Sequence, residues 1–119
     1  MTAGPLDRVR SDPRVVALDA EGALEFAKRE APGLLLLPGV VARAEVPDVA
    51  VVLGELAVRF PGLRLAVADG DEATLKARFG LPGFPALLFV RDGEVKTALA
   101  RMHSWSTYES AARALGGAS

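Results

Sequence analysis

Apolar and polar residues alternate along this chain in short blocks, and the blocks predict strands and helices in turn. Each predicted strand is a short apolar or β-branched run bounded by turn residues such as Pro, Gly and Asp. The five runs are residues 14–18, 34–37 and 63–68, the run that follows Pro85, and residues 95–101. The run from Leu34 to Leu37 is apolar at every position, which is typical of a central strand buried on both faces.

Longer segments between these runs place apolar residues three and four positions apart, which indicates helices. The predicted helices are residues 20–30 after an Asp19 cap, residues 48–60, residues 69–79, and a terminal helix that ends near Gly116. Ser106 and Glu109 match a capping box at the start of that last helix, and Ser104 is an alternative cap.

The order of these elements is β-α-β-α-β-α-β-β-α. Strands that alternate with helices pair in parallel through right-handed crossovers, and Asp92-Gly93 between two apolar runs predicts a hairpin that adds antiparallel strands. We therefore predict one α/β domain at residues 14–116, with a central mixed sheet flanked by helices. Residues 1–13 contain Gly4, Pro5 and Pro13 among several charges and are predicted to be a loose lead-in.

Composition narrows the chemistry that such a domain could perform. The 119 residues include 14 Lys and Arg against 15 Asp and Glu, a formal charge of -1 that argues against a nucleic-acid-binding protein. The chain has no cysteine, which excludes disulfides, cysteine-bound zinc, iron–sulfur clusters and thiol catalysis. It also has a single histidine, and we predict neither a metal site nor a cofactor.

The sequence shows no segment that would insert into a membrane. Its longest apolar run, residues 34–42, is interrupted by Pro38 and Gly39 and is far shorter than the roughly 20 residues that span a bilayer. Residues 1–10 lack the apolar core of an export signal. We therefore expect a cytoplasmic protein.

The segment from Phe84 to Phe89 resembles the part of a thioredoxin in which a cis-proline precedes the fourth strand. This resemblance implies a thioredoxin-like fold and a cis peptide bond at Pro85, whereas a trans proline at a strand entry is the alternative. Thioredoxins carry Trp-Cys-x-x-Cys in the loop that corresponds to residues 38–47, and here the loop holds neither the cysteines nor the tryptophan. The buried acid of the thioredoxin proton relay is also absent from residues 34–37. The scaffold is therefore expected without its redox chemistry.

Three further segments, Gly54 to Pro61, Arg78 to Ala86 and Met102 to Trp105, resemble the cysteine-free, thioredoxin-like hydrogenase accessory proteins of the HyaE/HupG type. Ser104 stands where that family often has proline. The resemblance implies a non-enzymatic chaperone that assists the maturation of a membrane-bound [NiFe] uptake hydrogenase. Its partner would be the precursor of the hydrogenase small subunit, bound through its twin-arginine signal peptide before export.

Peptide binding of this kind needs an apolar groove and carboxylates. In thioredoxin-like proteins the backbone beside the cis-proline can pair with an extended peptide, and carboxylates accept paired hydrogen bonds from arginine. The candidate peptide-binding residues are Val40, Val41, Phe84 and Pro85 for the groove and Glu45, Asp48 and Glu55 for the arginines.

For each carboxylate taken alone, a structural interpretation is favoured over binding of an arginine. Asp48 lies at a predicted helix start, where negative charge is favoured. Glu55 has Arg59 four residues on, and such a pair contributes only a few tenths of a kcal/mol. The acidic group at residues 69–72 is better explained as a helix cap.

His103 and Trp105 form the remaining candidate motif, as a structural element or as a surface that faces a partner. We expect His103 to cap the last helix or to pack at the end of the preceding strand, because no partner ligands or triad accompany it. Trp105 could present an aromatic surface to a partner, but sealing the edge of the core is the favoured interpretation.

Two other functions remain open from the sequence. One is a cysteine-free thioredoxin-like adaptor or protein-interaction module with an unrelated partner. The other is an enzyme that uses the scaffold without thiols, which would ordinarily need a Cys or Ser in residues 38–47, and that loop contains neither.

Overall fold

A computed structural model describes residues 4–116, in which five strands and five helices follow one another. The elements are α1 (Pro5–Ser11), β1 (Val15–Leu18), α2 (Ala20–Lys28), β2 (Gly33–Leu37), α3 (Val46–Arg59), β3 (Arg64–Ala68), α4 (Glu72–Phe79), β4 (Ala86–Arg91), β5 (Glu94–Ala100) and α5 (Trp105–Ala114). From β1 onward this is the predicted order, and one helix precedes it.

The strands form one mixed sheet in the order β1-β3-β2-β4-β5. β3 pairs in parallel with both β1 and β2, whereas β4 pairs antiparallel with β2 and with β5. In the centre of the sheet, Leu35 lies opposite Ala66 on one side and opposite Leu88 on the other. All five residues of β2 are buried, which confirms the central strand that its apolar run predicted.

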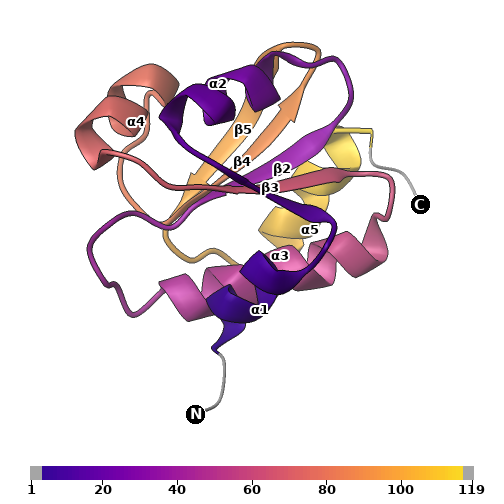
Figure 1. The fold of residues 1–119 in the computed structure, drawn as a ribbon. Coiled ribbons are helices and arrows are strands. Elements are labelled where there is room, and N and C mark those ends of the chain that lie inside the picture. The colour runs from indigo at the N-terminus through magenta and orange to yellow at the C-terminus, as the bar shows by residue number, and fades with distance from the viewer. Residues whose placement is uncertain (1–3, 117–119) are drawn as a thin grey trace.

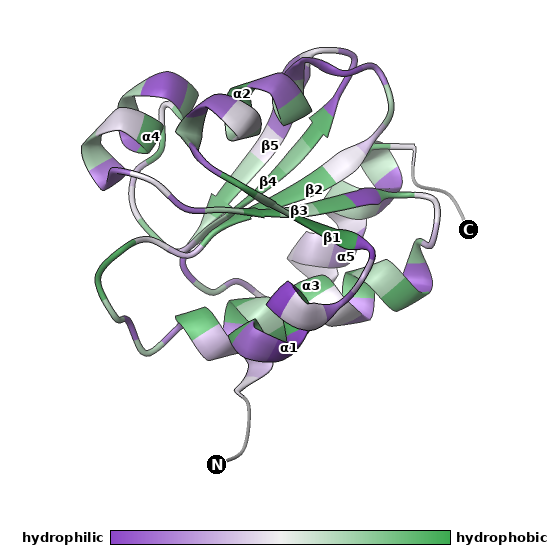
Figure 2. Ribbon diagram, viewed as in Figure 1, coloured by the Kyte–Doolittle hydropathy of each residue, from purple (hydrophilic) through white to green (hydrophobic). Residues whose placement is uncertain are grey.

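Helices cover both faces of the sheet (Figure 1): α2 and α4 lie on one side, and α1, α3 and α5 lie on the other. The inner strands of the sheet are the most uniformly apolar segments of the fold (Figure 2). Because side chains alternate along a strand, Leu34 and Leu36 belong to the core beneath α3, and Leu35 and Leu37 belong to the core beneath α2 and α4. The sheet therefore separates two cores.

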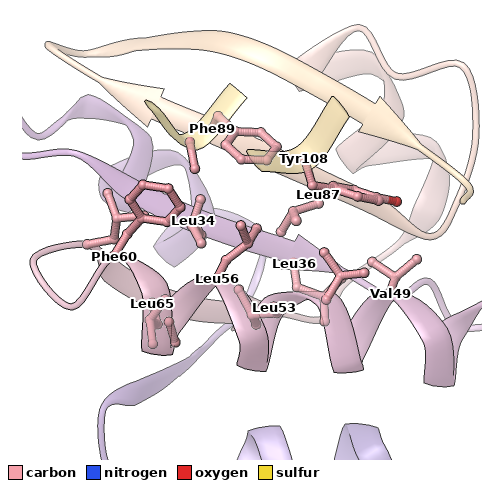
Figure 3. Close-up of a cluster of buried hydrophobic side chains, with 14 of the residues drawn as sticks. Leu34, Leu36, Val49, Leu53, Leu56, Phe60, Leu65, Leu87, Phe89 and Tyr108 are labelled. Carbon is pink, nitrogen blue, oxygen red and sulfur yellow. The ribbon is translucent and has the colours of Figure 1, made fainter. Parts of the chain in front are cut away.

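The larger core lies between the sheet and α3, as Figure 3 shows. The apolar stripe of α3 places Val49, Leu53 and Leu56 against the sheet, each at most 1% exposed. Tyr108 of α5 closes the far side of this core with 0% exposure. The stripe predicted for residues 48–60 is confirmed, with a start two residues earlier at Val46.

The N-terminal segment corrects one expectation, because residues 5–11 are a helix and not a loose lead-in. Pro5 occupies the first turn, where a missing N–H costs nothing, and Val9 is buried against the core beneath α3. Arg10 adds hydrogen bonds of 2.6 and 2.9 Å to the carboxylate of Asp69, at the end of β3. Tertiary contacts thus stabilise a helix in a segment whose Gly, Pro and charged residues had predicted no regular structure.

In the C-terminal half, the predicted hairpin is confirmed, and the last helix has the second of its two predicted caps. Asp92 and Gly93 have φ angles of 56° and 77°, the left-handed pair that a tight two-residue turn requires. The last helix begins after Ser104, which is the alternative cap, and the Ser106–Glu109 capping box does not form. Glu109 instead pairs with Arg59 of α3. Within residues 4–116, no helix combines the length and the apolar character needed to cross a membrane.

Candidate functional site

The loop between β2 and α3, residues 38–45, is the candidate site. It leaves the sheet at the carboxyl end of a parallel strand, where open α/β sheets place their binding sites. Figure 1 shows it projecting at the same end of the sheet as the start of α4 and the chain that enters β4. Three segments far apart in sequence therefore meet here: the loop, the first turn of α4, and Phe84-Pro85.

Glu72, in the first turn of α4, holds the loop. Its two carboxylate oxygens accept hydrogen bonds from the two terminal nitrogens of Arg43, each 2.8 Å long. The oxygen Oε2 also accepts the backbone N–H groups of Val40 at 2.7 Å and Val41 at 3.2 Å. One carboxylate thus satisfies four donors from the loop, and paired arginine–carboxylate bonds are among the stronger polar contacts in proteins.

These contacts change the titration of Glu72. The hydrogen bonds from Arg43 lower the pKa of the Glu72 carboxyl to about 2, aided by the amides of Val41 and Val40 and opposed by desolvation. Glu72 in turn raises the pKa of Arg43 above its usual value. The pair is therefore ionised throughout the neutral range.

The Arg43 guanidinium lies over the ring of Phe84, with its carbon 5.6 Å from the centre of the ring. Gly39 makes room for this arrangement with a φ angle of 86°. A Cβ atom at Gly39 would lie 2.6 Å from Glu72 Oε2 and would press against the Arg43 guanidinium. The loop is thus shaped closely around the ion pair.

The peptide bond between Phe84 and Pro85 is cis, as the resemblance to thioredoxins predicted. Both residues are buried, with Phe84 5% exposed. The carbonyl of Pro85 already accepts a 2.7 Å hydrogen bond from the N–H of Arg101. Phe84 therefore lies beneath Arg43 of the loop, and the Pro85 carbonyl is already bonded.

Four of the other candidate residues lie around the loop. Val40 and Val41 are 68% and 57% exposed, so the tip of the loop presents two apolar side chains to solvent. Glu45 directly precedes α3, and Asp48 is an exposed residue of its first turn. Asp48 therefore has the helix-start position that its structural interpretation predicted.

Glu55 lies apart from the loop, on an exposed position of α3 beside Pro5 and Arg8 of α1. The predicted pair with Arg59 is not formed, because Arg59 bonds to Glu109 of α5. The structure thus separates Glu55 from Glu45 and Asp48, which begin the same helix.

His103 has the structural role that was expected, whereas Trp105 lies at the surface. The Nε2 atom of His103 lies 2.9 Å from the carbonyl oxygen of Ala100, and its ring packs edge-on against Tyr108, so it packs at the strand end as expected. Trp105 is 37% exposed and does not seal the core, which corrects the expectation. Tyr108, three residues on, occupies that buried position.

The acidic group at residues 69–72 has three different roles. Asp71 caps α4 by accepting the N–H of Thr74 at 2.9 Å, as predicted, whereas Asp69 binds Arg10 and Glu72 binds the loop. The sequence did not indicate the pair of Arg43 and Glu72, because 29 residues separate them and only the fold brings them together. Among residues 4–116, no three His, Asp or Glu side chains are grouped as metal ligands would be.

A hollow lies beside β1 and α2, away from the loop, and includes Phe26 and Arg64 in its lining. Arg64 stacks 4.2 Å above the ring of Phe26 and donates hydrogen bonds to the carbonyls of Phe26 and Ala31. These contacts stabilise the end of α2, so the arginine already has a structural role there.

Known proteins resemble this chain in sequence over most of its length. The profile of the family described as "Hydrogenase-1 expression protein HyaE" matches residues 7–108. "Hydrogenase expression/formation protein HupG" of Bradyrhizobium diazoefficiens is 50% identical over 66 residues, which are 54% of this chain and 45% of that protein. "Hydrogenase expression/formation protein HoxO" of Azotobacter vinelandii is 36% identical over 93 residues, which are 76% of this chain and 63% of that protein. The matches thus span about half to two thirds of these relatives.

The fold is that of thioredoxins. Oxidised thioredoxin O2 from Arabidopsis thaliana superimposes with a TM-score of 0.67, over 86% of this chain and 94% of that one. The sequence identity is 17%, so this similarity concerns the fold alone.

Proposed function

Because the chain belongs to the family of hydrogenase-1 expression protein HyaE, we propose that it acts in the maturation of a [NiFe] uptake hydrogenase. In this proposal it is a non-enzymatic chaperone in the cytoplasm. It binds the twin-arginine signal peptide of the small-subunit precursor before export. The names of the relatives support a role in hydrogenase expression or formation, and the site supports binding of a peptide.

The observation that carries the proposal is the construction of loop 38–45. The loop follows β2, as the thiol-bearing loop does in the thioredoxins that this chain resembles, and the chain contains no cysteine. Its tip instead exposes Val40 and Val41, and an ion pair fixes its base. An exposed apolar tip beside carboxylates suits the binding of a peptide that carries both apolar and arginine side chains.

In this proposal, different residues of the site contact the apolar part and the arginines of the signal peptide. Val40 and Val41 contact the apolar part of the signal peptide, and burying them on binding provides a hydrophobic contribution. Glu45 and Asp48, at the start of α3, attract the arginines. Glu55 is a more remote contact for the same peptide, on the α1 side of α3.

Titration of a fluorescently labelled twin-arginine leader peptide into the full chain tests this proposal. We expect saturable binding that weakens as the NaCl concentration rises, because exposed charge pairs are screened by salt. Replacing both arginines of the peptide by glutamine should weaken binding at least about tenfold, which corresponds to the loss of two charge-assisted contacts.

Protein variants locate the binding face. Val40→Asp with Val41→Asp should weaken binding of the leader peptide, whereas Val58→Asp should not, since Val58 is a 73% exposed valine of α3 distant from the loop in sequence. Absence of binding at high micromolar peptide and low salt would contradict the proposal. That result would favour the adaptor function with an unrelated partner.

A further inference from the structure

We propose that Glu72 and Phe84 form a binding site for a guanidinium group, and that Arg43 fills this site in the free protein as an internal substitute for an arginine of the partner. The partner arginine displaces Arg43 when it binds. The assignment of that arginine to a twin-arginine leader rests on the proposed function. The site itself rests on the geometry of the loop.

The site has the two features that arginine recognition requires. The Glu72 carboxylate offers both oxygens side by side, and both bonds to Arg43 measure 2.8 Å. The Phe84 ring offers an apolar, π-rich surface 5.6 Å from the guanidinium carbon. A planar guanidinium matches both features, whereas a lysine ammonium can match only the charge.

The site is also more enclosed than an ordinary surface ion pair. The side chains of Arg43 and Glu72 are 26% and 21% exposed, the lowest values for a cation and an anion among the ion pairs of residues 4–116. Surface pairs such as Lys28 with Glu25, at 60% and 72%, leave both groups in water. Because Gly39 provides space that any side chain would fill, the loop backbone is adapted to hold a guanidinium there.

Glu72 remains in place without Arg43. It belongs to the first turn of α4, and the N–H groups of Val40 and Val41 bind the same carboxylate independently of the arginine. Arg43, in contrast, comes from a loop with no regular secondary structure, between two exposed alanines. The carboxylate is thus the fixed half of the pair, and the arginine is the half that can be exchanged.

Exchange of one guanidinium for another avoids the main cost of opening the site. Removing Arg43 alone would leave the Glu72 carboxylate with the N–H groups of Val40 and Val41 as its donors, which is less favourable than the paired state. Replacing it by a partner arginine keeps the charge paired throughout. When Arg43 leaves, the partner arginine takes its place over the Phe84 ring, so the same two side chains hold either guanidinium.

The first test uses only a small arginine probe, N-acetyl-L-arginine amide, so it does not depend on the proposed function. In Arg43→Ala, and in Arg43→Gln as a second variant, titration followed by NMR should shift the amide signals of Val40 and Val41 saturably. The wild type and the double variant Arg43→Ala with Glu72→Gln should show no saturable shift. N-acetyl-L-lysine amide should bind more weakly than the arginine probe.

The second test uses the leader peptide and exploits the opposite signs that displacement predicts. Arg43→Gln should tighten binding at least about threefold, because the internal competitor is lost, and Glu72→Gln should weaken it by a similar factor. Arg78→Gln is the matched control, since it also breaks an arginine–glutamate pair between two elements and removes one positive charge. It should leave the affinity within a factor of two.

The outcomes separate the two ideas. If the leader peptide binds no variant while the arginine probe binds Arg43→Ala, the proposed function fails and the guanidinium site stands. If the probe does not bind a folded Arg43→Ala or Arg43→Gln protein, the site is overturned. If Arg43→Gln and Arg78→Gln increased the affinity for the leader peptide equally, the site would also be overturned. The loss of one positive charge from the protein would then explain the higher affinity.

Discussion

Glu72 is the residue on which the contacts of loop 38–45 converge. Its pKa of about 2 in the folded protein is below its ordinary value of 4.5, because Arg43 and two backbone amides favour the ionised form. A carboxyl whose pKa is lower in the folded state stabilises the fold above its unfolded pKa. This stabilisation is lost as the pH falls from about 4.5 towards about 2.

We expect Glu72→Gln to reduce the free energy of unfolding at pH 7 and to have a smaller effect at pH 2.5. Arg43 is the charged group paired with Glu72 and stays protonated in this window, and Glu45 acts on Arg43. Urea unfolding of both proteins at several pH values provides the measurement. Parallel stability curves for the two proteins across this range would contradict the assignment.

Tyr108 shows how one buried hydroxyl closes the end of the core. The hydroxyl donates to the carbonyl of Arg101 at 3.1 Å and accepts the N–H of His103 at 3.2 Å. Tyr108→Phe keeps the ring packing and removes both bonds, so we expect the free energy of unfolding to fall by about 1 kcal/mol. Chemical denaturation would measure the change.

Ser106→Ala is a suitable control for this change, because the predicted capping box at that position is not formed. It should change the free energy of unfolding by less than about 0.5 kcal/mol. A Tyr108→Phe protein as stable as the wild type would show that water satisfies the two backbone groups equally well.

At the scale of single elements, α1 is the part that the sequence described least well. Leu6 and Val9 stand three residues apart on one side of α1 and pack against the core beneath α3. Val9 is 9% exposed, so Val9→Ala should lower the free energy of unfolding by about 1–2 kcal/mol. Thermal or urea unfolding would measure this loss.

Arg8→Ala is the control for α1, since Arg8 is an exposed residue of the same helix. Its effect should stay within about 0.5 kcal/mol. If Val9→Ala were as stable as the wild type, the segment would contribute as little as the loose lead-in that the sequence suggested.

At the scale of the whole molecule, stability depends on a central strand that serves two cores. Leu36 and Leu35 of β2 are each 0% exposed and point to opposite faces of the sheet. We expect Leu36→Ala and Leu35→Ala each to cost about 2–5 kcal/mol, because each leaves a cavity in a different core. A total stability of about 5–15 kcal/mol would be reduced by a large fraction in either case.

Val16→Ala is the control for these two variants. Val16 belongs to the edge strand β1 and is 51% exposed, so its replacement should cost less than about 1 kcal/mol. A small effect of either leucine variant would mean that one face of the sheet contributes little to the stability of the fold.

The sequence by itself determined the order of the elements from β1 to α5, the buried central strand and the hairpin at Asp92-Gly93. It did so because each of these is encoded by residues that are neighbours along the chain: an apolar run, a helical stripe, or a turn dipeptide. The absence of cysteine likewise excluded thiol chemistry without any knowledge of the fold. The cis bond at Pro85 followed from the resemblance to thioredoxins.

Only the tertiary structure decided how the charged groups pair and which aromatic side chain is buried. Arg43 with Glu72, and Arg59 with Glu109 in place of Glu55, are contacts between segments that the sequence keeps far apart. Long charged side chains select partners by distance in space, and local spacing contributes only a few tenths of a kcal/mol to that choice. The burial of Tyr108 and the exposure of Trp105 also depend on the tertiary structure, because the packing of α5 on the sheet determines which side of the helix faces the core.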